Sequence, residues 1–353
     1  MSIFFAILLF SFLIFIHELG HFVAAKLSGV QVNEFALFMG PAIFKKKVGD
    51  TLYSIRCIPI GGYCAMEGED EDTDNPGSFQ KAKRWKRLCI LLAGAFMNFV
   101  TGVLLMAIVF APVKQVIVPT IAEADEGNTI IYDGGLQIGD RFVEMDGEKI
   151  ILQSDFSMIL MLNPGDYHDI VVERDGKLVE LNDFYMEKHE FPNEDGTTSL
   201  RYGFSFGIEE LSGGKKLQYI WDNSWGVVRS VRMSLQMLFT GKAGLQDMTG
   251  PVGITQIMAE TAANSSTIVD AILNMLYFGG FIAINLAVMN LLPIPALDGG
   301  RAVCLLLTAA YEGITKKKLN PKYEGYLHGI GMVLLLALMA IILFKDVFMI
   351  FKG

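Results

Sequence analysis

The chain opens on MSIFFAILLFSFLIFIHELGHFVAA, residues 1–25, an apolar stretch with two histidines and one glutamate near its end. Residues 1–16 carry no charged side chain, and roughly 20 apolar residues suffice to cross a bilayer as a helix. On such a helix His17 and His21 stand at i and i+4, so both imidazoles project from one face. Because ionisable groups at membrane depth are costly, these residues indicate a function.

These residues form the pattern H-E-x-x-H, in which two histidines bind zinc and the glutamate serves as general base. We therefore take His17 and His21 as metal ligands and Glu18 as the catalytic base. A catalytic zinc usually has three protein ligands and one open position, so one more ligand is expected elsewhere in the chain.

The third ligand is expected among the acidic residues of the later apolar stretches. Those inside or at the ends of these stretches are Asp270, Asp298, Glu324 and Asp346. Asp298 lies in residues 290–300 (NLLPIPALDGG), where two prolines and two glycines should break a helix. Irregular backbone at membrane depth is tolerated where it is buried in protein or lines a cavity. We therefore predict Asp298 as the third ligand; the alternative is that it is solvated where the span ends.

Composition indicates a membrane protein, because 52% of the residues are hydrophobic and the mean hydropathy is +0.40. Four stretches are apolar and long enough to cross a bilayer, namely residues 2–25, 88–111, 272–292 and 327–350. The loops that follow the first and third stretches are basic, whereas residues 113–267 hold 12 Lys and Arg against 24 Asp and Glu. The positive-inside rule then places the basic loops in the cytoplasm and the acidic segment outside. A sequence pI of about 5.1, without an aromatic-basic patch, argues against a nucleic-acid partner.

Two further parts of the chain are β-rich. Residues 26–87 contain short β-like runs with a turn at Gly49-Asp50, which predicts a membrane-associated β-hairpin. Residues 113–212 contain short β-runs with a hairpin turn at 174–177 (RDGK), which predicts a soluble α+β domain. Residues 213–241 have apolar residues at helical spacing but too many charges to span, so a helix along the outer membrane surface is expected. The remaining histidines are expected to be structural residues at surfaces or headgroups: His168, His189 and His328.

With these motifs in view, the chain resembles the site-2 protease family of intramembrane metalloproteases. The resemblance rests on His17-Glu18-x-x-His21 together with Asn290-x-x-Pro293-x-Pro295-x-Leu297-Asp298-Gly299, two motifs far apart in sequence. The order of parts also looks like that of bacterial proteases of the regulator-of-sigma-E type, here with a single PDZ domain. It covers essentially the whole chain.

The resemblance implies that zinc is bound by His17, His21 and Asp298, and that Glu18 first takes a proton and later protonates the leaving amine. It also implies two substrate-binding residues, Asn98 and Asn290.

Asn98 belongs to a family element written Gly-Pro-x-x-Asn. Here the element is Gly94-Ala95-Phe96-Met97-Asn98, with alanine in place of proline. Whether the helix is kinked at this position is therefore an open question at the level of sequence. The alternative for Asn98 is a role in helix packing, because polar side chains often bridge membrane helices.

The PDZ assignment rests on residues 133–147 (DGGLQIGDRFVEMDG), which resemble a glycine- and aspartate-containing run of bacterial PDZ domains. Such domains can bind chain ends by strand addition. In the family they are thought to exclude substrates whose outer domain is still large, which would make the enzyme a second cutter. The hairpin within residues 32–60 resembles the family's substrate-clamping β element, so we expect an unwound substrate segment to pair there.

The predicted fold is a polytopic α-helical membrane protein with four transmembrane helices, a membrane-associated β-hairpin and one extracytoplasmic PDZ-like α+β domain. The expected parts are the first span with H-E-x-x-H (1–25), the hairpin loop (26–87), the second span (88–112), the PDZ-like domain (113–212), an amphipathic helix and linker (213–268), the third span with the Leu-Asp-Gly motif (269–300), a cytoplasmic loop (301–325) and the fourth span (326–353).

The predicted function is that of an intramembrane zinc metalloprotease of a bacterial inner membrane, with its active site near the cytoplasmic side. Its partners would be the lipid bilayer, single-span substrates such as anti-sigma factors or remnant signal peptides, and possible ligands of the PDZ domain. One alternative is a non-proteolytic membrane metal carrier or transporter, although no repeat between two halves is evident. Another is a PDZ scaffold with a degenerate membrane anchor.

Overall fold

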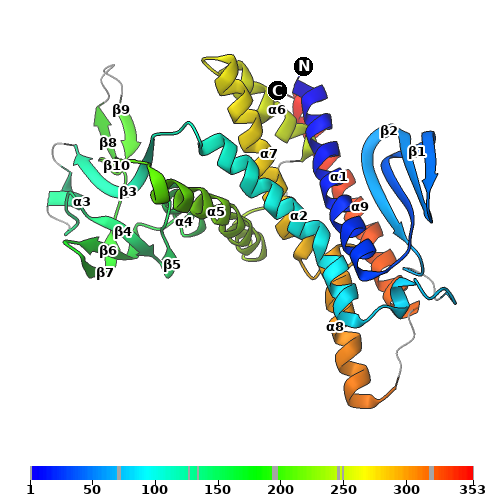
Figure 1. Ribbon diagram of the computed structural model, residues 1–353. Helices are drawn as coiled ribbons and strands as arrows, with labels where there is room; N and C mark the ends of the chain where they lie inside the picture. The colour runs from blue at the N-terminus through cyan, green and yellow to red at the C-terminus, as the bar shows by residue number, and fades with distance from the viewer. Residues whose placement is uncertain are drawn as a thin grey trace. The chain divides into compact units, whose positions relative to one another are not determined.

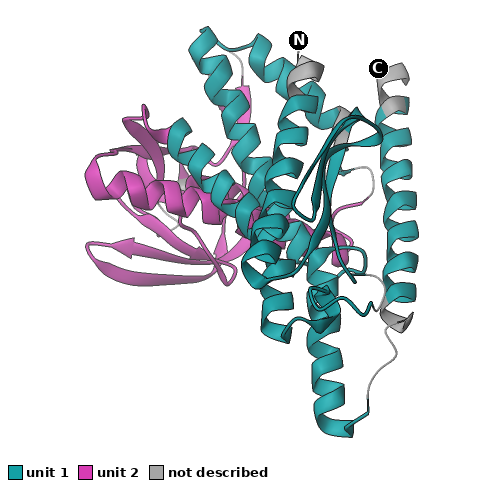
Figure 2. Cartoon of the chain, turned by 45° about the vertical axis from the view of Figure 1, so that its right-hand side comes forward, with its two compact units in different colours: residues 1–109, 245–353 teal, residues 110–244 magenta. Residues whose placement is uncertain are grey.

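The computed structural model describes residues 2–69, 73–125, 128–132, 135–192, 198–244, 247–248, 250–317 and 322–352. The chain divides into two compact units, residues 1–109 with 245–353 and residues 110–244 (Figure 2). The first two residues of the PDZ-like run, Asp133 and Gly134, lie outside the described residues.

Unit 1 is mainly helical (Figure 1). Its helices are α1 (Ser2–Ser28), α2 (Arg84–Phe110, whose last residue falls in unit 2), α6 (Pro251–Ala263), α7 (Ile268–Leu291), α8 (Asp298–Thr315) and α9 (Lys322–Lys352), with a 3-10 turn η1 (Phe79–Lys81) before α2. Among the described residues, four helical stretches are long and apolar enough to cross a membrane: Ile7–Ser28, Arg84–Phe110, Ile268–Leu291 and Gly325–Asp346. The four expected spans are therefore present.

Part of one expected loop is helical. Residues 301–325 were expected as the cytoplasmic loop between the third and fourth spans, and α8 occupies this stretch as far as Thr315. The run AVCLLLTAA at 302–310 contains good helix formers, and its apolar side chains Ala302 and Leu305 are buried in a cluster with α1, α2 and the hairpin. Of the basic residues in this stretch, Arg301 lies in the first turn of α8, and Lys316 is its C-cap in a left-handed conformation.

The hairpin consists of β1 (Val32–Val48) and β2 (Thr51–Met66), joined at Gly49-Asp50 as the sequence predicts. Both strands bend back on themselves: Phe38 and Gly40 in β1, and Gly61 in β2, have positive φ. As a result, residues 34–37 pair with residues 52–55 and also with residues 62–65, while residues 42–48 pair with residues 51–56. In the described register, the two outer edges of this folded hairpin are residues 42–48 and 62–66.

Unit 2 is a β-domain with helices packed on its sheet. Its main sheet has the strand order β10-β3-β4-β6-β7, with β5 paired to β4, and a separate hairpin of β8 and β9. The strands are β3 (Gln115–Ala124), β4 (Arg141–Met145), β5 (Glu148–Lys149), β6 (Tyr167–Arg174), β7 (Lys177–Tyr185), β8 (His189–Pro192), β9 (Thr198–Arg201) and β10 (Phe204–Glu210); the helices are α3 (Thr129–Tyr132), α4 (Gln153–Leu162) and α5 (Gly213–Phe239). The turn predicted between β6 and β7 is confirmed by the pairing of Arg174 with Lys177.

Helix α5 belongs to this domain. Its Met233 is buried in the core of the β-domain, and Arg229 forms an ion pair of 2.8 Å with Asp155 of α4. At least one of the basic residues that suggested a helix on the membrane surface, Arg229, therefore pairs with the β-domain.

His168 was expected at the surface, and this prediction is wrong. Its exposed fraction is 2%, and its Nδ1 lies 2.8 Å from Asp146 Oδ2. His168, Ile170 and Val172 occupy every second position of β6 and share its inward face. Because histidine is polar, the sequence did not indicate that this position is buried. His189 is exposed, as expected.

Candidate metal centre

Three side chains predicted as ligands meet in unit 1. The Nε2 atoms of His17 and His21 lie 3.0 and 3.2 Å from Asp298 Oδ2, and 3.2 Å from each other. Together they form a group that could hold a metal ion. Residues from α1 and from the first turn of α8 are thus brought together although nearly 300 positions separate them in sequence.

The imidazoles are oriented by α2. His21 Nδ1 lies 2.9 Å from the carbonyl oxygen of Ile90, an acceptor that requires the proton to sit on Nδ1. The Nε2 lone pair of His21 therefore points at the cluster, as a metal ligand requires.

His17 is contacted by Asn98, whose exposed fraction is 1%. Asn98 Nδ2 lies 3.4 Å from His17 Nδ1, while Asn98 Oδ1 is buried without a hydrogen-bond partner. Turning the amide over gives Oδ1 a donor, the Nδ1 proton of His17. In that arrangement the Nε2 lone pair of His17 also faces the cluster.

A glycine makes room for both rings. A Cβ on Gly94 of α2 would lie 2.4 Å from His21 Nε2 and 2.7 Å from His17 Cε1. Any side chain there would displace the imidazoles. The close approach of α2 to α1 therefore depends on this glycine, which the sequence showed only as part of a motif.

Asp298 is presented by a helix break, as predicted. Helix α7 ends at Leu291, and α8 begins at Asp298. The connecting residues turn back tightly, since Cβ atoms on Gly299 and Gly300 would lie 2.3 Å from Leu291 O and 2.2 Å from Ile294 O. Asn290, in the last turn of α7, is half-buried.

The three atoms fit a zinc ion. Tetrahedral ligands at about 2.0–2.1 Å from zinc stand roughly 3.3 Å from one another, close to the observed separations. Asp298 Oδ2 is buried and has no hydrogen-bond partner, which is costly for a carboxylate oxygen unless a cation accompanies it. Two imidazoles and one carboxylate are also a donor set that zinc enzymes use.

Glu18 lies between the ligands and the hairpin. It is half-buried on α1, and a Cβ on Gly62 of β2 would lie 3.7 Å from Glu18 Cγ. Ser11, two turns earlier on α1, donates a hydrogen bond of 3.1 Å to the carbonyl of Pro59. The outer edge of β2 therefore runs past the predicted general base.

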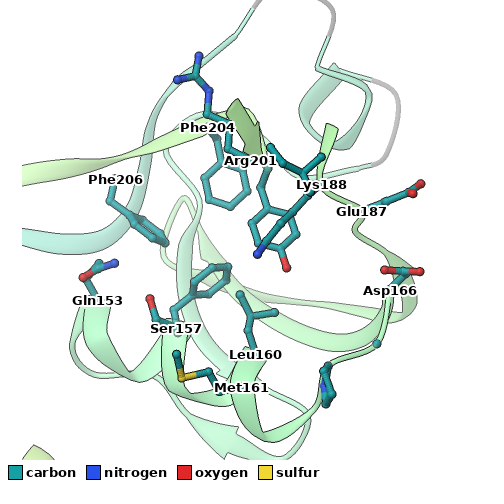
Figure 3. A pocket seen from close by; sticks show the side chains of 15 residues that line it. Gln153, Ser157, Leu160, Met161, Asp166, Glu187, Lys188, Arg201, Phe204 and Phe206 are labelled. Atoms are coloured by element: carbon teal, nitrogen blue, oxygen red, sulfur yellow. The ribbon is translucent and has the colours of Figure 1, made fainter. Parts of the chain in front are cut away.

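A second candidate site lies within unit 2. A cavity of about 680 Å³ separates α4 from the end of β9 and from β10, and Figure 3 shows Ser157 and Leu160 of α4 facing Phe204 and Phe206 of β10. Strand β10 is last in the strand order, so in the described sheet one of its edges is unpaired. The cavity thus lies beside a free strand edge, and its lining combines aromatic and aliphatic side chains with charged ones, namely Asp166, Glu187, Lys188 and Arg201.

Helices of spanning length that carry an H-E-x-x-H pair and a distant aspartate define a class, the membrane-embedded zinc metalloproteases. Comparison with known proteins agrees: the family model described as peptidase family M50 matches residues 5–338. The chain belongs to this family, and it is an intramembrane zinc metalloprotease of the site-2 type.

Curated relatives are similar over their full length. A candidate zinc metalloprotease of Clostridium acetobutylicum is 35% identical, with 97% of this chain and 96% of the relative aligned. Another, from Clostridium perfringens, is 34% identical with 98% of each chain aligned. The regulator of sigma-W protease RasP of Bacillus subtilis is 26% identical with 97% of each chain aligned.

Proposed function

We propose that the chain hydrolyses peptide bonds within membrane-spanning segments, with zinc held by His17, His21 and Asp298 and with Glu18 as general base. The observation that carries this proposal is the convergence of the three ligand atoms within 3.2 Å of one another. Zinc at this position would supply Lewis-acid polarisation of the scissile carbonyl and would lower the pKa of a water to about 7.

The protein's own residues do the rest. Glu18 receives the proton of the attacking water and delivers it to the leaving amine. Ile90 fixes the tautomer of His21 through its carbonyl, and Asn98 does the same for His17 through its amide. We therefore assign Asn98 an orienting role beside the substrate contact expected from the sequence, and retain Asn290 as a substrate-binding residue.

The substrate must be extended when it is cut, because a helix conceals its peptide carbonyls in its own hydrogen bonds. We propose that the edge formed by residues 62–66 of β2 pairs with the unwound segment. This edge carries no charge and passes Glu18, whereas the opposite edge carries Lys45, Lys46 and Lys47. Lysines along an edge discourage further strand pairing.

A polar cluster stiffens the preferred edge. Glu34 accepts hydrogen bonds from Ser54 (2.6 Å) and Arg56 (2.7 Å), and it also interacts with Tyr63 of the edge. Burial raises the pKa of Tyr63 to about 12, with a further contribution from its hydrogen bond to Glu34, so the phenol stays protonated and donates. Burial opposes ionisation of Glu34, but the three hydrogen bonds lower its pKa overall.

We propose that unit 2 is the PDZ-like domain and lies outside the cytoplasm. The support is its groove between α4 and the edge strand β10, its six-stranded main sheet, and the acidic composition of this part of the chain. A chain end could add to β10 as a strand with its side chains in the groove. A domain so placed would also restrict access by substrates with large outer domains.

We propose single-span proteins of a bacterial inner membrane as substrates, either anti-sigma factors or remnant signal peptides. The first class is supported by the name of the Bacillus subtilis relative, a regulator of sigma-W protease. The basic segment between the first two spans supports an active site near the cytoplasmic side.

The test uses the purified full chain in detergent and a labelled single-span substrate. Glu18→Gln keeps the shape of the side chain and removes its basicity, so cleavage should be lost while zinc is retained. A metal carrier would need no base at position 18. Cleavage unaffected by Glu18→Gln would reject the mechanism.

A further inference from the structure

The backbone that presents Asp298 is strained. Ala296, two residues before the ligand, has φ of 83°, a left-handed conformation that residues other than glycine rarely adopt. Such a conformation is energetically unfavourable and persists only where the surroundings enforce it. Contacts from α9 enforce the conformation of Ala296 in this protein.

The last helix supplies a hydrogen bond to this residue. The backbone N–H of Ala296 donates to Nδ1 of His328 on α9 at 3.0 Å. His328 was expected to face lipid headgroups, but its ring is directed at the loop that ends in Asp298. The acceptor lies on an element more than 30 residues away, so the bond fixes the loop from outside.

The same helix also touches the neighbouring proline. A Cβ on Gly331 would lie 2.4 Å from Pro295 Cβ and 2.7 Å from Pro295 O, so α9 approaches the loop as closely as a glycine allows. His328 and Gly331 are one turn apart and therefore share a face of α9. That face is the one in contact with the loop.

Beyond this contact, α9 is thinly packed. The residues from Met332 to Lys345 are all described, and none of them is buried. Near the end of α9, Lys345 donates to the carbonyl of Met248, and Asp346 accepts a bond of 3.1 Å from the N–H of Gly253 in the first turn of α6. A cavity of about 420 Å³, lined by Ala296, Arg301 and His328 among others, adjoins the loop contact. At the loop, α9 thus contributes the His328–Ala296 hydrogen bond and the close approach of Gly331 to Pro295, with a cavity beside them.

We propose that His328 is a positioning residue for the metal site: by accepting the Ala296 hydrogen bond, it holds the loop conformation that aims Asp298 at the two imidazoles. The inference rests on the proposed metal centre. It implies that a displacement of α9 at this point loosens the third ligand. The last span would thereby be coupled to the integrity of the zinc site.

The test measures zinc affinity of the detergent-purified full chain by competition with a chromophoric chelator, with zinc alone as the probe. His328→Leu should weaken zinc binding by about tenfold or more, within the range seen when partners of metal ligands are removed. His328→Asn should retain most of the wild-type affinity. Its Oδ1 is three covalent bonds from Cα, as Nδ1 of histidine is, and it can accept the same hydrogen bond. His328→Gln, whose amide lies one bond further out, should not.

A glycine pair on α9 provides the matched control. Gly331→Ala should weaken zinc binding by pushing α9 from Pro295, whereas Gly329→Ala, with nothing within 4 Å of its added Cβ, should leave the affinity unchanged. The absorption spectrum of the cobalt-substituted protein should change in Gly331→Ala and His328→Leu only, since it reports ligand geometry.

The outcomes separate the two levels of the argument. Wild-type zinc affinity in His328→Leu, or equal loss in the Asn and Leu variants, would overturn the positioning role. Unchanged affinity in His17→Ala would instead overturn the metal centre itself.

Discussion

Each unit of this protein has a strand edge open to pairing, and the surroundings of the two edges differ. In unit 1, residues 62–66 of β2 pass Glu18 and the cluster of His17, His21 and Asp298. In unit 2, β10 faces α4 across a groove whose lining includes Leu160, Phe204 and Phe206. The backbone of either edge can receive an extended peptide. What differs is the chemistry beside the edge, which suits the first to cutting and the second to recognition.

The largest expected effect comes from Glu18→Gln, which should change the chemistry beside β2 and leave the groove at β10 unaffected. Glu18→Gln should lower the cleavage rate by about 10²–10⁴-fold, the range typical of general acid–base catalysis. It should leave peptide binding at the β10 groove unchanged. Rates come from a gel assay with a single-span substrate, and binding from fluorescence anisotropy of a labelled peptide ending in a large apolar residue.

The converse change should affect recognition only. Phe206→Arg removes an aromatic side chain from the wall of the groove and should weaken binding of the same peptide by about tenfold, because an apolar contact with the peptide is lost. The matched control is Ile208→Arg on the same strand, where Ile208 is 68% exposed and does not line the groove. Equal binding by both variants would contradict peptide capture at this site.

The two edges of the hairpin itself can be compared by crosslinking. In the Glu18→Gln background, which should hold substrate uncut, a photoreactive side chain at Ala65 should crosslink to substrate at least about five times more than one at Lys46, since lysine-bearing edges resist pairing. Equal yields at the two positions would argue against pairing at residues 62–66.

The smallest expected effect concerns the substrate. Replacing residues near its cut site by a helix-breaking pair such as Asn-Pro should raise the cleavage rate by about threefold, because less helix must be unwound before an edge can pair with it. The control places the same pair at the far end of the span. A rate independent of local helicity would count against the extended bound state.

The parts of the site that sequence could predict are those with local signals. His17, Glu18 and His21 are visible as a four-residue spacing within an apolar helix, and Asp298 as a carboxylate between prolines and glycines. The spans follow from apolar length, and the turns at Gly49-Asp50 and 174–177 from residue type. Each of these depends on residues that are neighbours in the chain.

The missed features depend on contacts between distant segments. The hairpin folds back at Phe38, whose positive φ is not typical of its residue type. The buried pair of His168 and Asp146 joins β6 to the turn after β4, and His328 meets Ala296 from another helix. Sequence alone placed both histidines at surfaces because a lone histidine has no local pattern that reveals its partner.

The central claim is that a zinc ion lies beside residues 62–66 of β2, whereas the groove at β10 needs no metal. X-ray absorption at the zinc edge, on the purified full chain, tests this most directly. The account predicts one zinc per chain, bound by two imidazole nitrogens and a carboxylate oxygen at about 2.0–2.1 Å, and lost in Asp298→Ala. Active protein without zinc, or zinc whose ligands are unchanged in Asp298→Ala, would contradict it.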